Sequence, residues 1–260
     1  MPRLAANLAY LFAERPPLER FGAAAAAGFR AVELLYPHDL PPAAVKTELE
    51  RHGLKQLGIN TSPGRTGEAG LAALPGRERE WEASFRWALD YAVAIGAATV
   101  HCLAGIVELE QRPAAETVYI RNLRNAAAEA ARAGIVLLIE PLNPRDRPGY
   151  LLNRVEHAAD IVGKVGADNL RIQFDFYHVQ IVGGDLIRRF EAHLPLIGHT
   201  QIAAVPSRHE PDEGEVNYPA IFAEMDRLGY SGFVGCEYRP RGRSEDGLAW
   251  ARPYGIVPRK

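Results

Sequence analysis

Short apolar runs alternate along the chain with longer stretches in which apolar residues recur every three or four positions. Such runs are typical of strands buried on both faces of a parallel sheet, and the longer stretches are typical of helices that bury one face. The clearest run is Ile135–Ile139, which is followed by Glu140 and Pro141. Because proline has no N–H group for a sheet ladder, the strand is predicted to end there. A carboxylate at the end of a buried strand needs a partner, a metal ion or a catalytic role.

The pattern predicts eight strands, each followed by a helix that a glycine often terminates. Each strand–helix unit spans about 32 residues, which is the length that a βαβ repeat requires. No linker divides the chain, so a single (β/α)₈ TIM barrel over residues 1–260 is predicted. A doubly wound sheet is the alternative, but neither a G-x-G-x-x-G turn nor a P-loop occurs. The predicted strands are 4–8, 30–35, 54–59, 98–102, 135–139, 170–174, 196–202 and 233–237, and the predicted helices are 18–27, 41–51, 77–95, 115–133, 185–193, 218–228, 245–251 and one that Asn153 caps.

Composition and charge restrict the classes of partner that the protein is expected to bind. Hydrophobic residues make up 47% of the chain, charged residues 24%, and the formal net charge is −2 with acids and bases interspersed. This distribution argues against a nucleic-acid groove, and no apolar stretch has the length of a signal peptide or a membrane span. Cys102 and Cys236 form no CxxC pair and are expected to be buried, reduced thiols. We therefore expect a cytoplasmic protein without nucleic-acid or membrane partners.

Polar side chains end several predicted strands, at the edge where a TIM barrel carries its active site. The last four of them end consecutive strands and therefore converge on one point. Three carboxylates in such proximity raise one another's pKa unless a cation lies between them. Together with an amide oxygen they form an all-oxygen set, which favours Mg²⁺ or Mn²⁺ over Zn²⁺. A lone acid at a strand end is more often a helix cap or loop anchor, but four in register weaken that explanation. The strand-end residues are Glu33, His101, Glu140, Asp175, Gln201 and Glu237.

Further polar residues surround this point. His178 lies just past the sixth strand and is predicted to serve the site, whereas His199 is expected to be a hydrogen-bonded histidine inside the barrel. The charged loop Pro206–Glu215 follows the seventh strand and is either a solvated surface loop or part of the site. In the second case Arg208 would hold a substrate carboxylate, which the guanidinium fork suits. H-E-x-x-H and G-x-S-x-G motifs are absent, so acyl-transfer chemistry has no support.

Several motifs, taken together, are specific for one protein family. They are Ala5–Leu8, Phe21–Glu33, Ala73–Arg77, Ile139–Asn143, Gln173–His178, Gly198–Ile202, Arg208–Glu215 with Asn217 and Tyr218, and Gly229–Tyr238. With these residues, over nearly its whole length, the chain resembles the hydroxypyruvate isomerase family, within the larger group of xylose isomerase-like TIM barrels.

The resemblance implies an isomerase that uses a divalent metal ion, Mg²⁺ or Mn²⁺. The metal ligands of the family would match Glu140, Asp175, Gln201 and Glu237. The acid/base pair of the family would match Glu140 and Glu237. Gln201 separates the chain from the sugar epimerases of the group, which usually carry a histidine there. Substrate contacts are expected from His178, Arg208, His101, Glu210 and Asn7.

The implied reaction interconverts hydroxypyruvate and tartronate semialdehyde through a cis-enediolate. The loop Thr61–Gly70 departs from the family because it is shorter and lacks a tryptophan, so 2-oxo-tetronate or another small keto acid or ketose is an alternative substrate. An abasic-site endonuclease is a remote alternative, because Gln201 replaces a histidine that its zinc cluster needs. A third alternative is a barrel that binds a ligand without catalysing a reaction, and the complete set of carboxylates argues against it. Assembly into a homo-oligomer stays open.

Overall fold

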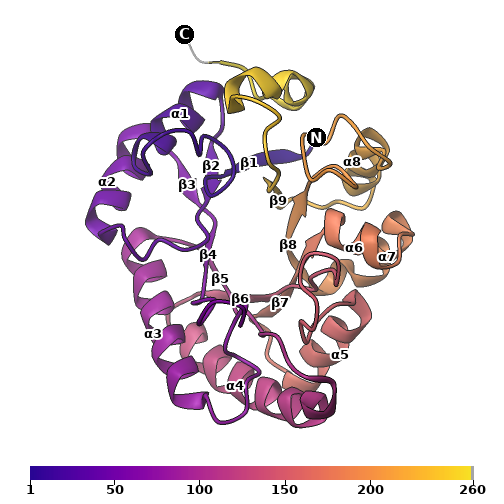
Figure 1. The fold of residues 1–260 in the computed structure, drawn as a ribbon. Helices are drawn as coiled ribbons and strands as arrows, with labels where there is room; N and C mark the ends of the chain where they lie inside the picture. The colour runs from indigo at the N-terminus through magenta and orange to yellow at the C-terminus, as the bar shows by residue number, and fades with distance from the viewer. Residues whose placement is uncertain (259–260) are drawn as a thin grey trace.

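A ring of helices surrounds a barrel of parallel strands in the computed structural model, which describes residues 1–258 (Figure 1). Each strand pairs in parallel with its neighbour, and the last strand lies beside the first, so the chain runs once around the barrel. The strands are β1 Arg3–Asn7, β2 Ala31–Glu33, β3 Lys55–Gln56, β4 Gly58–Asn60, β5 Thr99–His101, β6 Val136–Ile139, β7 Leu170–Asp175, β8 Ile197–Ile202 and β9 Phe233–Cys236.

The segments β3 and β4 together form the third strand of the barrel. β3 pairs with β2, whereas β4 pairs with β5, and only Leu57 separates them. The N–H group of Leu57 donates to the carbonyl oxygen of Val32 (2.9 Å), and its own carbonyl accepts from Ala98 (3.0 Å). Hydrogen bonding therefore continues around the barrel through Leu57, and the predicted TIM barrel is confirmed.

The helices form the outer layer and bury their apolar faces against the strands. In α3 the buried residues include Trp81, Phe85, Ala88 and Ala92, at the spacing that the sequence predicts. Gly96 ends this helix with a φ of 70°, a conformation that glycine adopts without strain. The helices are α1 Glu19–Ala27, α2 Pro42–His52, α3 Glu78–Ile95, α4 Arg112–Arg132, α5 Val155–Val165, α6 Phe176–Val182, α7 Leu186–His193 and α8 Tyr218–Arg227, and the 3₁₀ segments are η1 Leu109–Gln111, η2 Leu194–Leu196 and η3 Ser244–Tyr254.

Three details of the helices differ from the prediction. The short helix α6 was not predicted, because seven residues do not establish a helical period. Asn153 does not cap α5: Arg154 is the residue before the helix and makes no side-chain cap. The last element, η3, is a 3₁₀ helix with Pro253 inside it, where an α-helix was predicted. None of these differences moves a strand end.

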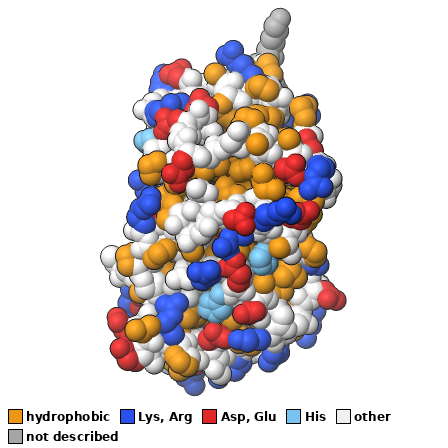
Figure 2. Space-filling view, turned by 90° about the vertical axis from the view of Figure 1, so that its right-hand side faces the viewer, with side chains coloured by type: hydrophobic (Ala, Val, Ile, Leu, Met, Phe, Trp, Pro, Cys, Tyr) orange, Lys and Arg blue, Asp and Glu red, His pale blue; other side chains and the backbone are white. Residues whose placement is uncertain are grey.

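Both thiols and the visible surface agree with the expectations from composition. Cys102 and Cys236 are buried and free. On the face that Figure 2 shows, acidic and basic side chains are interspersed with hydrophobic ones, without an extended patch of one sign. Within residues 1–258, we find no helix with the length and hydrophobicity needed to cross a membrane.

Candidate active site

A cavity of about 490 Å³ opens at the carboxyl ends of the strands. Glu140, which follows β6, and Glu237, which follows β9, both line it. The loop Thr61–Gly70 contributes much of another wall, so the segment that departs most from the resembled family borders the same space. The barrel geometry brings these segments together, because all parallel strands end at the same rim. Predicted site residues in the lining are His101, Glu140, His178, Arg208 and Glu237.

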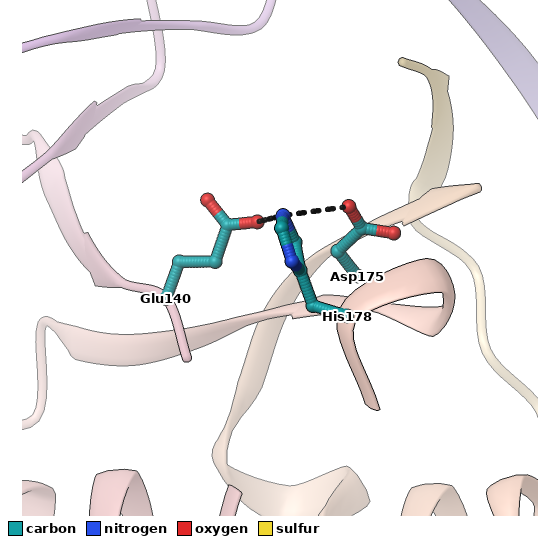
Figure 3. Close-up of side chains that lie close together, drawn as sticks. All are labelled: Glu140, Asp175 and His178. Carbon is teal, nitrogen blue, oxygen red and sulfur yellow. Dashed lines mark ion pairs between the residues drawn. The ribbon is translucent and has the colours of Figure 1, made fainter. Parts of the chain in front are cut away.

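Glu140, Asp175 and His178 form a buried cluster, of which Glu140 and His178 line the cavity (Figure 3). Nε2 of His178 lies 3.6 Å from Oδ2 of Asp175 and 3.9 Å from Oε1 of Glu140. Both of these carboxylate oxygens are buried, and neither has a hydrogen-bond partner in the part of the chain that the structure describes. Oδ1 of Asp175 instead caps α6 by accepting from the N–H group of Tyr177 (2.9 Å). The residue therefore is a helix cap, and it still directs one free oxygen toward Glu140.

The ring of His178 has a defined tautomer. Its Nδ1 faces the backbone N–H group of Asn143 (3.1 Å) and the side-chain Nδ2 of the same residue (2.7 Å). The amide of Asn143 is oriented by Asp146, whose N–H group donates to Oδ1 and whose Oδ2 accepts from Nδ2. Because Nδ1 faces two donors, it is an acceptor, and the proton of the neutral ring lies on Nε2. His178 thus presents an N–H group, and not a lone pair, to the carboxylates.

Glu237 is fully hydrogen-bonded. Its Oε1 pairs with Arg208 (2.7 Å), and its Oε2 accepts from Gln201 (2.7 Å) and Asn7 (3.1 Å). Arg208 also reaches Asp146 (3.1 Å), and its guanidinium lies over the rings of Tyr10 and Tyr177. Its backbone has a φ of 58°, in the left-handed region that few side chains favour. These contacts fix the guanidinium between the loops that follow β6 and β8.

Gln173 connects the two halves of the site, although the sequence did not single it out. Its Nε2 donates to Oε2 of Glu140 (2.8 Å) and to Oε1 of Gln201 (2.8 Å). Gln173 precedes Asp175 by two positions on β7, so strand alternation places both side chains on the same face. That alternation was the signal from which the residue could have been identified.

Burial dominates the electrostatics of the three acids. Burial, with the charges of Glu237 and Asp175, raises the pKa of Glu140 well above its ordinary value. Burial raises the pKa of Glu237 to about 8, although Arg208 acts to lower it. Burial likewise raises the pKa of Asp175 to about 6. Protons or a cation must therefore compensate these charges at neutral pH.

Two predicted substrate contacts are not in the cavity lining. Asn7 lies behind Glu237 and donates to that residue and to Glu33. Glu210 is buried elsewhere, where it accepts hydrogen bonds from the backbone N–H group (3.1 Å) and Nε (3.0 Å) of Arg241. The carboxylate of Glu210 thus connects its loop to the segment after β9. His199 is the buried, hydrogen-bonded core residue that the sequence predicted, with Glu33 as its partner.

Comparisons with known proteins agree with this geometry. The family model described as "Xylose isomerase-like TIM barrel" matches residues 21–254. The chain is 49% identical to a 2-oxo-tetronate isomerase of Cupriavidus necator, over 98% of this chain and 99% of that protein. It is 39% identical to a hydroxypyruvate isomerase of Escherichia coli, over 98% of this chain and 100% of that protein. A crystal structure from Brucella melitensis titled as an AP endonuclease of family 2 is 47% identical, with a TM-score of 0.96 over 98% of this chain and 100% of that one. The named isomerases confirm the prediction of an isomerase-type enzyme.

Proposed function

Because this chain belongs to the xylose isomerase-like TIM barrel family, and because its site holds two buried glutamates in one cavity, we propose that it isomerises a short 2-oxo acid. The reaction would move the carbonyl group from C2 to C3 of an acid that carries a hydroxyl group on C3. We propose the four-carbon 2-oxo-tetronate as substrate, with the three-carbon hydroxypyruvate as the alternative. The higher identity to a 2-oxo-tetronate isomerase and the altered loop Thr61–Gly70 in the cavity wall support this choice.

Glu140 and Glu237 are the proposed proton carriers. One carboxylate takes the proton from C3, which leaves an enediolate across C2 and C3, and the other delivers a proton to C2. The hydroxyl proton passes from the oxygen on C3 to the oxygen on C2, so the carbonyl group ends at C3. Their raised pKa values suit this task, because they bring the loss and gain of a proton closer to neutral pH. The observation that carries the proposal is that both acids line a single cavity from opposite segments of the chain.

We further propose that Mg²⁺ or Mn²⁺ binds Glu140, Asp175, Gln201 and Glu237. The fit rests on Oε1 of Glu140 and Oδ2 of Asp175, which are buried oxygens without a hydrogen-bond partner. These oxygens and the amide oxygen of Gln201 are donors that both cations prefer. His178 is excluded from this set, because its Nε2 carries the proton. When bound, such a cation would polarise the substrate carbonyl and stabilise negative charge on its oxygens.

Arg208 is the proposed partner of the substrate carboxylate. In the free protein its Nη2 pairs with Glu237 and its Nη1 with Asp146. A substrate carboxylate that binds the guanidinium would compete with Glu237. It would release Oε1 of Glu237 for metal binding and proton transfer. Arg65 at the cavity wall is a second cationic group, and its backbone is fixed because its N–H group donates to Glu68 (2.7 Å).

Turnover of a defined panel tests the function. The purified chain is freed of metal and then assayed with 2-oxo-tetronate, hydroxypyruvate and a neutral ketose, each with Mg²⁺, with Mn²⁺ and with EDTA. We expect the largest kcat/KM for 2-oxo-tetronate, deuterium incorporation from D₂O, and loss of both in EDTA. Turnover of the neutral ketose alone would contradict the proposal. An abasic DNA duplex is included, because incision with bound zinc would support the nuclease alternative instead.

A further inference from the structure

Glu33 ends β2 and is buried, yet the reaction proposed above gives it no role. Its Oε1 contacts Nε2 of His199, and its Oε2 accepts hydrogen bonds from Gln201 (2.8 Å) and Asn7 (3.0 Å). These three partners belong to β8 and β1, so the carboxylate connects the interior faces of three strands. His199 precedes Gln201 by two positions on β8, which places this contact one layer deeper in the barrel.

The barrel also reserves space for this carboxylate. Gly235 on β9 faces it, and a Cβ atom at that position would overlap Oε1 of Glu33. The three atoms nearest to such a Cβ all belong to the carboxyl group of Glu33. A side chain at position 235 would therefore displace the carboxyl group while leaving every proposed metal ligand chemically unchanged.

The carboxylate determines which end of the Gln201 amide faces which neighbour. Oε2 of Glu33 accepts from Nε2 of Gln201 (2.8 Å), so the nitrogen end of the amide lies toward Glu33. The same Nε2 donates to Oε2 of Glu237 (2.7 Å). The amide oxygen then points to the other side, where Nε2 of Gln173 holds it and also holds Glu140.

We propose that Glu33 is a positioning residue that fixes Gln201 with its oxygen toward the site of the divalent cation and its N–H groups toward Glu237. This inference rests on the proposed cation site, and it adds a residue outside the ligand set. A glutamine at position 33 would offer an N–H group as well as an oxygen, so that Glu237 and Gln173 alone would fix the orientation of the Gln201 amide. A turned amide, which offers the cation an N–H group in place of an oxygen, would then be populated more often. The carboxylate thus acts on the site through Gln201 and touches neither substrate nor metal.

Manganese binding tests this role directly and independently of the substrate. Metal-free wild type and the variant Glu33→Gln, which keeps the size of the side chain, are titrated with Mn²⁺ alone, and bound metal is followed by electron paramagnetic resonance. We expect the Kd for Mn²⁺ to rise roughly ten- to a hundredfold, as for other residues that orient metal ligands. With 2-oxo-tetronate, kcat is expected to fall more than KM rises. Glu116→Gln on the surface of α4 is the matched control, because it removes the same charge and should leave the Kd unchanged.

Gly235→Ala is the second variant, because it moves the carboxyl group of Glu33 out of its place without changing its chemistry. We expect the same rise in the Kd for Mn²⁺, with folding checked by circular dichroism. A Kd for Glu33→Gln equal to that of the wild type, or a wild type that does not bind Mn²⁺, would overturn the inference. If the wild type binds Mn²⁺ but turns over no 2-oxo acid, the proposed function fails while the comparison of Kd values still decides the role of Glu33.

Discussion

Raising the pH from about 5 to about 8 is expected to destabilise the metal-free protein, and bound Mn²⁺ is expected to reverse this effect. Burial raises the pKa of Glu237 from 4.5 to about 8, against the opposing charge of Arg208. In the unfolded chain this carboxyl group has its ordinary pKa, so the folded protein holds an extra proton between the two values. The associated stability is fully present below the unfolded pKa and is lost as the pH rises through the folded pKa.

The size of the effect follows from the shift. A pKa that rises from 4.5 to about 8 corresponds to about 5 kcal/mol, at about 1.36 kcal/mol per pKa unit. Asp175 and Glu140 lie in the same cluster and titrate in coupled steps, so we assign this value to the cluster. Between about pH 5 and about pH 8, roughly 4 kcal/mol of unfolding free energy should be lost.

Urea unfolding at several pH values, after chelation, measures this loss. The variant Glu237→Gln is the comparison, because it removes this titration and keeps the size of the side chain. The wild type is expected to lose stability relative to the variant as the pH rises, and Mn²⁺ at about a hundred times its Kd should return about 2.7 kcal/mol to the wild type. Parallel pH profiles of the two proteins would refute the assignment of the buried proton to this cluster.

Three further predictions concern catalysis. Glu140→Gln is expected to lower kcat about 10²- to 10⁴-fold and to abolish deuterium uptake from D₂O, and near-normal uptake would exclude Glu140 as a proton carrier. Arg208→Lys loses the fork that contacts Glu237 and Asp146 together, so KM for the 2-oxo acid should rise about tenfold or more in steady-state assays, whereas an unchanged KM would place the substrate carboxylate elsewhere. Arg65→Ala is expected to reduce the preference for 2-oxo-tetronate over hydroxypyruvate about tenfold. If the ratio of the two kcat/KM values is the same in variant and wild type, the loop Thr61–Gly70 does not select the substrate through Arg65.

The fold could be predicted from the sequence because the patterns that indicate its strands and helices are local and recur along the chain. Each buried strand is an apolar run, and most helices end at a glycine in the left-handed conformation. The break at Leu57 and the helix α6 were missed, because each involves only a few residues and leaves no period in the sequence. The 3₁₀ geometry of η3 was also missed, because a spacing pattern over seven residues does not distinguish it from an α-helix.

The strand-end residues of the site could also be predicted, because closing the barrel forces neighbouring strand ends together. Residues on loops lack this constraint. The loop after β8 brings Arg208 to Glu237 but turns Glu210 away to Arg241, although both belong to the same charged segment. Gln173 was not selected, and Glu33 was named as a strand-end residue without a role, because the importance of both lies in hydrogen bonds between strands distant in sequence.

Charge compensation gives a physical reason to expect a cation at this site. Arg208 is the guanidinium that pairs with Glu237, and its second contact goes to Asp146. Among residues 1–258, no cationic side chain lies within hydrogen-bonding distance of Glu140 or Asp175. The neutral ring of His178 cannot balance their charges, because burial keeps its pKa well below the ordinary value. Two protons or one divalent cation would restore neutrality at this point. Protons would prevail at low pH and the cation at neutral pH, so metal affinity should rise with pH over the range in which Asp175 and Glu237 lose their protons.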